Sequence, residues 1–279
     1  MPTDSRRITG PETSQSPHIY QKTNGTEIVL IDENKKRQDG RGLGDIRPMF
    51  LRAGIVSQAR GSAYMEQNQT KVICAVYGPR EIARREEFSW KGQITCEFKF
   101  ATFSCLHRRQ PQQDGEEKDF SVQLLEALEP AVCLHKFPKS QVNVYVTVLQ
   151  DDGSALAAAI TCASVALADA AIEMYDLVTG CSARISGGHI LLDPCHTEEY
   201  RSEKDNTVNN GSVTLGLMPS LRQVSAVTSK GELEFEHVKK AMDQCLEVCQ
   251  KLYPVLQQSL IKSVKEKLEM DKLSDCHTT

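Results

Sequence analysis

One stretch of the sequence, residues 154–170, constrains the fold more than any other. It reads Ser-Ala-Leu-Ala-Ala-Ala-Ile-Thr-Cys-Ala-Ser-Val-Ala-Leu-Ala-Asp-Ala, so apolar residues occupy every side of a helix of this length. In a soluble protein, a helix that is apolar around its whole circumference must be enclosed by other elements. Its alanines allow those neighbours to approach closely. The sequence therefore predicts a central helix over residues 154–170.

Short runs with strand character lie on both sides of this helix, and further segments have helical spacing. Residues 67–69 are predicted to form a hairpin turn, and Gly78-Pro79 is predicted to end the second strand of that hairpin. This order of elements predicts an α+β fold with two sheet portions and packed helices. The predicted strands are 49–51, 62–66, 70–77, 93–100, 141–149, 189–193, 212–218 and 224–228, and the other helical segments are 120–132 and 238–252.

The 279 residues divide into one domain and two tails. Residues 1–33 are polar and predict a flexible N-terminal arm, although a short apolar patch at 27–31 is suited to docking on a neighbouring surface. Residues 34–262 are predicted to form a single domain, and residues 263–279 a frayed C-terminal tail. An apolar run of about 18 residues, which a membrane span requires, does not occur.

The ten cysteines are too sparse in this chain for a disulfide scaffold. Cys74, Cys133 and Cys162 lie inside apolar stretches, which favours buried, reduced thiols. Cys245 and Cys249 are one helical turn apart, but neither a second pair nor a nearby histidine completes four zinc ligands. Since neither a Gly-x-Gly-x-x-Gly loop after a strand nor a P-loop occurs, the sequence predicts no metal and no cofactor.

The net charge of −4 hides an uneven distribution along the chain. Residues 41–110 contain twelve Lys and Arg against six Asp and Glu, whereas residues 111–260 contain eleven against twenty-one. Clustered cations attract a phosphate backbone, so any nucleic-acid surface is expected in the first of these segments. The alternative is that these arginines are solvated surface charges or pair with acids of the second segment.

Several motifs follow one another along the chain: Arg-Gln-Asp-Gly-Arg at 37–41, Asp-Ile-Arg-Pro at 45–48, and the segments 59–64, 70–81, 166–170, 174–178 and 217–219. In order and spacing they resemble the RNase PH family over about residues 33–260, and the segments 126–132 and 250–260 most resemble, within that family, subunits of the exosome ring. The resemblance implies an RNase PH-like (ribosomal protein S5 domain 2-like) fold. It also implies other RNase PH-like ring subunits, cap subunits and RNA in the ring pore as partners, without membrane or DNA, and location in nucleus, nucleolus and cytoplasm.

Active members of this family shorten RNA from its 3′ end with phosphate as the attacking group. Their phosphate site resembles Gly-Gly-Thr-Arg, which corresponds here to residues 152–155, with Asp152 in place of glycine and Ala155 in place of arginine. The family's Arg-Arg pair falls near the acidic run at 114–119, and its carboxylate position falls on Ser212. We therefore expect a subunit without catalytic residues. Asp193, Glu198 and Glu199 are interpreted as surface or structural residues.

The resemblance also implies which side chains contact RNA. Arg80, Arg84 and Arg85 match the loop that supplies an RNA-contacting arginine in active ring subunits, and Arg108 and Arg109 follow in a polar loop. Planar guanidinium groups suit phosphate oxygens. Two other functions stay open on the sequence: an active phosphorolytic 3′-5′ exoribonuclease, and a protein-interaction module that does not contact RNA.

Overall fold

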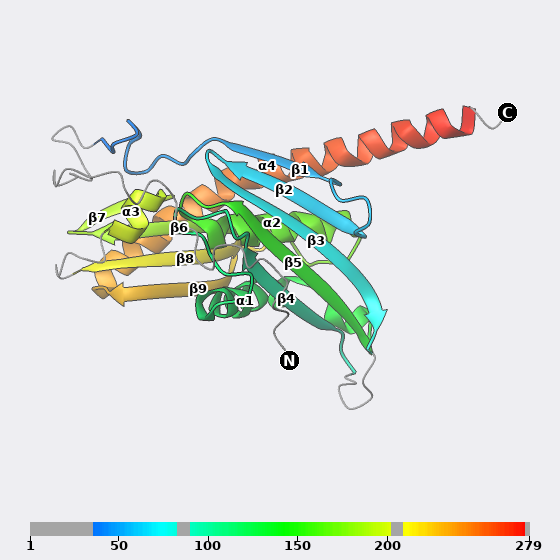
Figure 1. The fold of residues 1–279 in the computed structure, drawn as a ribbon, viewed down its shortest axis with the longest axis horizontal. Helices are drawn as coiled ribbons and strands as arrows, with labels where there is room; N and C mark the ends of the chain where they lie inside the picture. The colour runs from blue at the N-terminus through cyan, green and yellow to red at the C-terminus, as the bar shows by residue number, and fades with distance from the viewer. Residues whose placement is uncertain (1–35, 83–89, 202–208, 277–279) are drawn as a thin grey trace, which may run out of the picture.

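The computed structural model describes residues 36–82, 90–201 and 209–276. Two β-sheets lie side by side, with helices between and beside them (Figure 1). The predicted α+β fold with two sheet portions is confirmed. The predicted flexible arm at 1–33, with its apolar patch at 27–31, lies outside the described residues.

The first sheet has five strands in the order β1-β2-β3-β5-β4. All its neighbours pair antiparallel except β4 and β5, which are parallel and are connected through α1 (Gly115–Leu128). The predicted hairpin is confirmed, because β2 ends at Gln67 and β3 begins at Thr70. The strands are β1 (Met49–Ala53), β2 (Gly61–Gln67), β3 (Thr70–Glu81), β4 (Gln93–Phe100) and β5 (Ser140–Gln150).

The second sheet has four antiparallel strands in the order β7-β6-β8-β9. The sequence analysis found three of them and missed β6. Seven of the eight residues of β6 are buried, so the strand lacks the alternation that marks a strand with one wet face. The strands are β6 (Thr179–Ser186), β7 (His189–Leu192), β8 (Asn210–Met218) and β9 (Gln223–Glu232).

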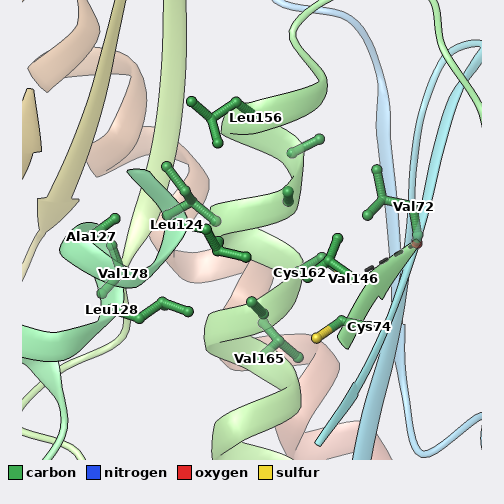
Figure 2. Packing of buried hydrophobic residues seen from close by; sticks show 14 of the residues in the cluster. Val72, Cys74, Leu124, Ala127, Leu128, Val146, Leu156, Cys162, Val165 and Val178 are labelled. Carbon is green, nitrogen blue, oxygen red and sulfur yellow. Dashed lines mark hydrogen bonds between the residues drawn. The ribbon is translucent and has the colours of Figure 1, made fainter. Parts of the chain in front are cut away.

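Helix α2 (Ala155–Asp169) is the predicted central helix, and every residue from Ala155 through Leu167 is buried. It packs against β2 and β3 of the first sheet and β6 of the second. Figure 2 shows Cys162 and Val165 of α2 between Val72 of β3 on one side and Leu128 of α1 on the other. The alanine-rich surface thus forms the centre of one continuous core.

Two elements differ from the predictions at a proline. Strand β3 does not end at Gly78-Pro79 but continues to Glu81, with an irregularity between Tyr77 and Arg80 in its pairing to β5. Proline is tolerated inside a sheet at such a bulge. Pro254 lies inside α4 (Phe235–Cys276), and the helix continues past it.

Helix α4 packs on β6, β8 and β1 and then extends beyond the body of the molecule (Figure 1). The tail at 263–279 was predicted to fray, but helix occupies it as far as Cys276. Ser263 is buried, and the Lys267 ammonium group lies 2.6 Å from the Asp169 carboxylate at the end of α2, so tertiary contacts stabilise this part of the helix. Two short elements were also missed by the sequence analysis: α3 (His196–Arg201) and the 3₁₀ turn Leu134–Lys136.

Nine of the ten cysteines, those from Cys74 to Cys249, are free thiols. Burial raises the pKa of Cys74 and of Cys162, which lie at the interface of β3 and α2. The predicted buried thiols are therefore confirmed for Cys74, Cys133 and Cys162. Within the described ranges, no helix is both long and apolar enough to cross a bilayer.

Candidate functional site

A polar cavity lies at the amino-terminal end of α2, between the two sheets. Ser154 and Ala155 form its floor at the start of the helix, and Ser212 of β8 lies on its wall. These residues were singled out separately in the sequence as the phosphate and carboxylate positions of the family. The structure brings them to one site, together with Phe100, Phe120, Gln123, Asp151, Leu156, Ala157, Ser182, Glu199, Thr214, Thr228 and Lys230.

Side-chain carboxylates of the chain itself accept hydrogen bonds from the backbone N–H groups of the loop before α2. The Ser154 N–H donates to Glu199 Oε2 at 3.0 Å, and the Gly153 N–H donates to Asp151 Oδ1 at 3.2 Å. Backbone N–H groups at a helix amino terminus attract anions. In this chain those two donors are already satisfied internally.

Both carboxylates are unfavourable neighbours for an incoming anion. Burial raises the pKa of Glu199, and burial likewise raises the pKa of Asp151. Lys230 is the one cation among the described residues that line this cavity, and its Nζ lies 4.6 Å from the Phe120 ring centroid. The described lining thus contains two acids and one cation.

The raised pKa of Glu199 predicts a pH-dependent contribution to stability. Because its pKa is higher in the folded than in the unfolded chain, this contribution is fully present below the unfolded pKa and is lost as pH rises through the folded pKa. Glu199→Gln keeps an oxygen acceptor for the Ser154 N–H but cannot ionise. We expect its free energy of unfolding, relative to the unmodified chain, to increase as pH rises above about 4, the ordinary pKa of glutamate.

Urea denaturation followed by circular dichroism at a series of pH values measures this difference. The exposed Glu129, changed to Gln, is the control and should show no such trend. A Glu199→Gln chain whose stability difference is constant over the range would contradict the assignment.

A network of buried ions holds the loop before α2 in place. Arg47 donates to both carboxylate oxygens of Asp193, from Nε at 2.9 Å and from Nη2 at 2.6 Å. It also donates to the carbonyl oxygens of Asp152 at 2.7 Å and Gly153 at 3.2 Å. Burial alone would raise the pKa of Asp193, but the bonds and charge of Arg47 hold it below its ordinary value.

Asp193 and Glu198 have structural roles, which agrees with one of the two interpretations drawn from the sequence. Asp193 is 2% exposed and Glu198 is 4% exposed, so neither is a surface residue. Glu198 lies 3.6 Å from the Arg37 guanidinium and accepts the Cys195 N–H at 2.9 Å. The sequence analysis quoted Arg37 and Arg47 only as family motifs. Apart from those motifs, nothing in the sequence indicates that both arginines are buried.

The arginines predicted to bind RNA do not form one cluster. Arg80 is exposed at the end of β3, and Arg84 and Arg85 lie outside the described residues. Arg108 is exposed in the loop after β4, at the opposite end of the first sheet, since Arg80 is aligned through β5 with Gln93 at the start of β4. The two exposed arginines that the structure describes, Arg80 and Arg108, therefore lie on two separate surfaces.

Arg109 is held by internal contacts. Its Nη2 donates to Glu116 Oε2 at 2.9 Å, and its guanidinium lies 4.1 Å from the Phe100 ring centroid. Its Nε donates to the Cys105 sulfur at 3.2 Å. This arginine therefore organises the loop at 101–113 and pairs with the acidic start of α1.

Comparisons with known proteins agree with this geometry. The profile of the RNase PH family, described as 3′ exoribonuclease family, domain 1, matches residues 45–173. The exosome complex component MTR3 of Homo sapiens is 41% identical over 286 aligned residues, which cover 96% of this chain and 98% of that protein.

Two solved structures share the fold. Rice (Oryza sativa) Rrp46 superposes with a TM-score of 0.69 at 24% identity, over 80% of this chain and 100% of that chain. An Archaeoglobus fulgidus exosome with RNA bound to the active site gives 0.68 at 22% identity, over 78% of this chain and 92% of that chain. With the family profile, the identity along nearly the whole chain and the shared fold all in agreement, the chain belongs to the RNase PH family.

Proposed function

We propose that the chain is a non-catalytic structural subunit of an RNA exosome ring. It supports 3′-to-5′ RNA processing and degradation by scaffolding the ring and helping to guide RNA. The 41% identity to the human exosome component MTR3 along nearly the full length of both chains supports a role in the same assembly. Its partners are other RNase PH-like ring subunits and cap subunits, in nucleus, nucleolus and cytoplasm.

One observation carries the non-catalytic part of the proposal: Glu199 and Asp151 occupy the loop donors that would otherwise face an anion. Phosphorolysis requires cationic and N–H donors to hold a phosphate dianion beside an already anionic RNA. Here Ala155 stands at the position of the family's arginine, and Ser212 stands where the family has a carboxylate. The cavity thus lacks a cation and a carboxylate at these two family positions.

Guidance of RNA is assigned to the exposed arginines of the basic segment. Arg80 and Arg108 present their side chains to solvent, and Arg84 and Arg85 belong to the same proposed rim. Because Arg109 pairs with Glu116, its role is to position the loop that carries Arg108. Phosphate contacts of this kind guide a strand without reading its sequence.

The catalytic prediction is tested with the purified full chain, a 3′-overhang RNA and inorganic phosphate. We expect no release of nucleoside diphosphate, because the missing cation and the two resident carboxylates both oppose phosphate binding. Chromatographic detection of the diphosphate product is the measurement. The proposal would be overturned if the RNA is shortened in a phosphate-dependent way and this shortening disappears in a Glu199→Ala variant. A known active exoribonuclease serves as the positive control.

The assembly prediction needs a separate measurement. The tagged chain should copurify with other RNase PH-like subunits, and native mass spectrometry should give a closed ring that contains one copy of it. A chain that remains monomeric in the presence of those subunits would contradict the scaffold role.

A further inference from the structure

Two groups of aromatic rings and cations lie toward one end of the first sheet: Tyr77, Tyr145 and Arg80 in one, Trp90 and Lys139 in the other. We call these two groups together the Trp90 strip, defined by Tyr77, Arg80, Trp90, Lys139 and Tyr145. It lies where β3 ends and β4 and β5 begin, at the lower right of the molecule in Figure 1. It lies toward the end of the sheet where β5 begins, whereas the cavity at the start of α2 lies just beyond the residue where β5 ends.

Trp90 is the most exposed large apolar side chain in the described part of the protein, at 88%. Its position is defined by the backbone next to it. The Gly92 N–H donates to the Leu134 carbonyl at 2.8 Å, and a Cβ at Gly92 would lie 2.3 Å from the ring of Phe137. The chain is therefore closely packed two residues after Trp90, while the indole itself is exposed to solvent. The Lys139 Nζ lies 5.8 Å from its ring centroid.

The tyrosines continue the strip along the sheet. Tyr77 of β3 and Tyr145 of β5 meet edge to face, with ring centroids 5.8 Å apart. The Arg80 guanidinium lies 5.4 Å from the Tyr77 centroid. Val72 and Val76 of β3 are buried and alternate with the half-buried side chains of the strand, so Tyr77 lies on the face of the sheet opposite α2.

The strand register brings the strip's members to one end of the sheet. Arg80 pairs with Gln141 of β5, and Gln93 of β4 pairs with the same residue. Lys139 immediately precedes β5, and Trp90 precedes β4 by three residues. The charged side chains around the strip are Arg80, Lys91 and Lys139 against Glu81 and Glu97, the β4 residue paired with Tyr145, so these residues leave a net charge of one positive unit.

This combination fits one chemical class of ligand. Exposed aromatic faces stack on unpaired bases, and cations beside them attract the phosphates that connect those bases. A duplex would hide its base faces from Trp90. A protein partner would have to supply acidic side chains for the cations of the strip. A single strand of RNA supplies both bases that stack on the rings and phosphates that pair with the cations.

We propose that the Trp90 strip is a binding site for single-stranded RNA, with Trp90 stacking on a base and Arg80 and Lys139 contacting phosphates. This deepens the proposed guidance of RNA and rests on it, but it assigns the guidance to base stacking as well as to arginines. The site discriminates single-stranded from double-stranded RNA, and it tolerates any base because every base has a π face.

The chain contains a single tryptophan, so its fluorescence reports on this site directly. We expect a single-stranded oligoadenylate RNA to quench the fluorescence of the full chain saturably, and the same RNA annealed to its complement to quench it far less. Anisotropy of a labelled RNA should show that Trp90→Ala weakens binding by about 5- to 150-fold, the range that loss of one base-aromatic stack corresponds to. Trp90→Phe should retain most of the affinity.

Phe235→Ala is the matched control, because Phe235 is also strongly exposed, at 81%, but lies at the start of α4. Its RNA affinity should equal that of the unmodified chain. The proposal is overturned if the chain binds no single-stranded RNA at low salt, or if RNA binds without quenching and equally well to Trp90→Ala. It is also overturned if the fluorescence responds only to ring subunits, which would make the strip a protein interface. Native mass spectrometry then shows whether the Trp90→Ala chain still assembles into the ring. Assembly without RNA binding separates failure of this proposal from failure of the scaffold role.

Discussion

Replacing Arg47 by alanine is expected to lower the free energy of unfolding by at least about 3–5 kcal/mol, the usual cost of removing one partner of a buried ion pair. The substitution leaves the Asp193 carboxylate, 2% exposed, without the donors that satisfy both of its oxygens. It also removes the donors to the carbonyls of Asp152 and Gly153, which begin the loop before α2. Urea denaturation followed by circular dichroism measures the loss.

Two comparisons make this prediction specific to the ion pair. Arg52→Ala, at an exposed position of β1, should change stability by no more than about 0.5 kcal/mol. Asp193→Asn should destabilise the chain too, and the double variant should lose less than the sum of the single variants, because the charge that Arg47 compensates is then absent. Strictly additive losses would contradict a direct pair.

The same pair predicts how stability depends on acid. Because Arg47 holds the pKa of Asp193 below its ordinary value, the pair's contribution is present above the unfolded pKa of aspartate and is lost as pH falls through the folded pKa. The Arg47→Ala chain should therefore lose less stability on acidification than the unmodified chain does, even though it is less stable at neutral pH.

The second large effect is expected at Gly61, where β2 passes the end of α2. A Cβ at this position would lie 2.2 Å from the backbone nitrogen of Ala170 and 2.5 Å from the carbonyl oxygen of Ala166. Both atoms belong to the last turn of the helix, where the Ala170 N–H donates to the Ala166 carbonyl. Overpacking in a core usually costs about 1–3 kcal/mol, and backbone atoms cannot rotate away as side chains can. We expect Gly61→Ala to cost about 3 kcal/mol or more.

Gly115→Ala is the matched control for this substitution. Gly115 begins α1, and a Cβ there would meet nothing within 4 Å. Since alanine favours a helix over glycine by up to about 1 kcal/mol, this variant should be as stable as the unmodified chain or more so. Thermal unfolding of both variants distinguishes close packing at Gly61 from a general effect of replacing glycine. If Gly61→Ala and Gly115→Ala unfold at the same temperature, β2 and α2 are less closely packed than in the structure.

Elements with a strong local pattern were predicted well. The central helix α2 was predicted almost to its ends, because an apolar surface on all sides has no other stable placement in water. Strand β4, with its period of two, was predicted at its observed bounds. Strand β6 was missed because burial on both faces removes the alternation, and its Thr-Gly-Cys-Ser-Ala composition is not typical of a strand.

The site shows a similar division. The replacement of arginine by Ala155 and of a carboxylate by Ser212 was read from motif spacing, and the structure shows the two residues on one cavity. The sequence analysis did not foresee that Glu199 would accept the Ser154 N–H, because 45 residues separate the two in the chain. RNA contact is predicted from the sequence for Arg108 and Arg109 alike, and the structure adds that Arg109 also contacts Glu116 and Phe100.

By itself, the sequence determined the enclosed helix, the two groups of strands and the family. These follow from the apolar pattern of neighbouring residues and from motifs, both of which are properties of short segments. Only the tertiary structure decided which charges are buried together, as with Arg47 and Asp193, 146 residues apart. The pairing of charges depends on distance in space and on exclusion of water, and the folded chain alone sets these two quantities.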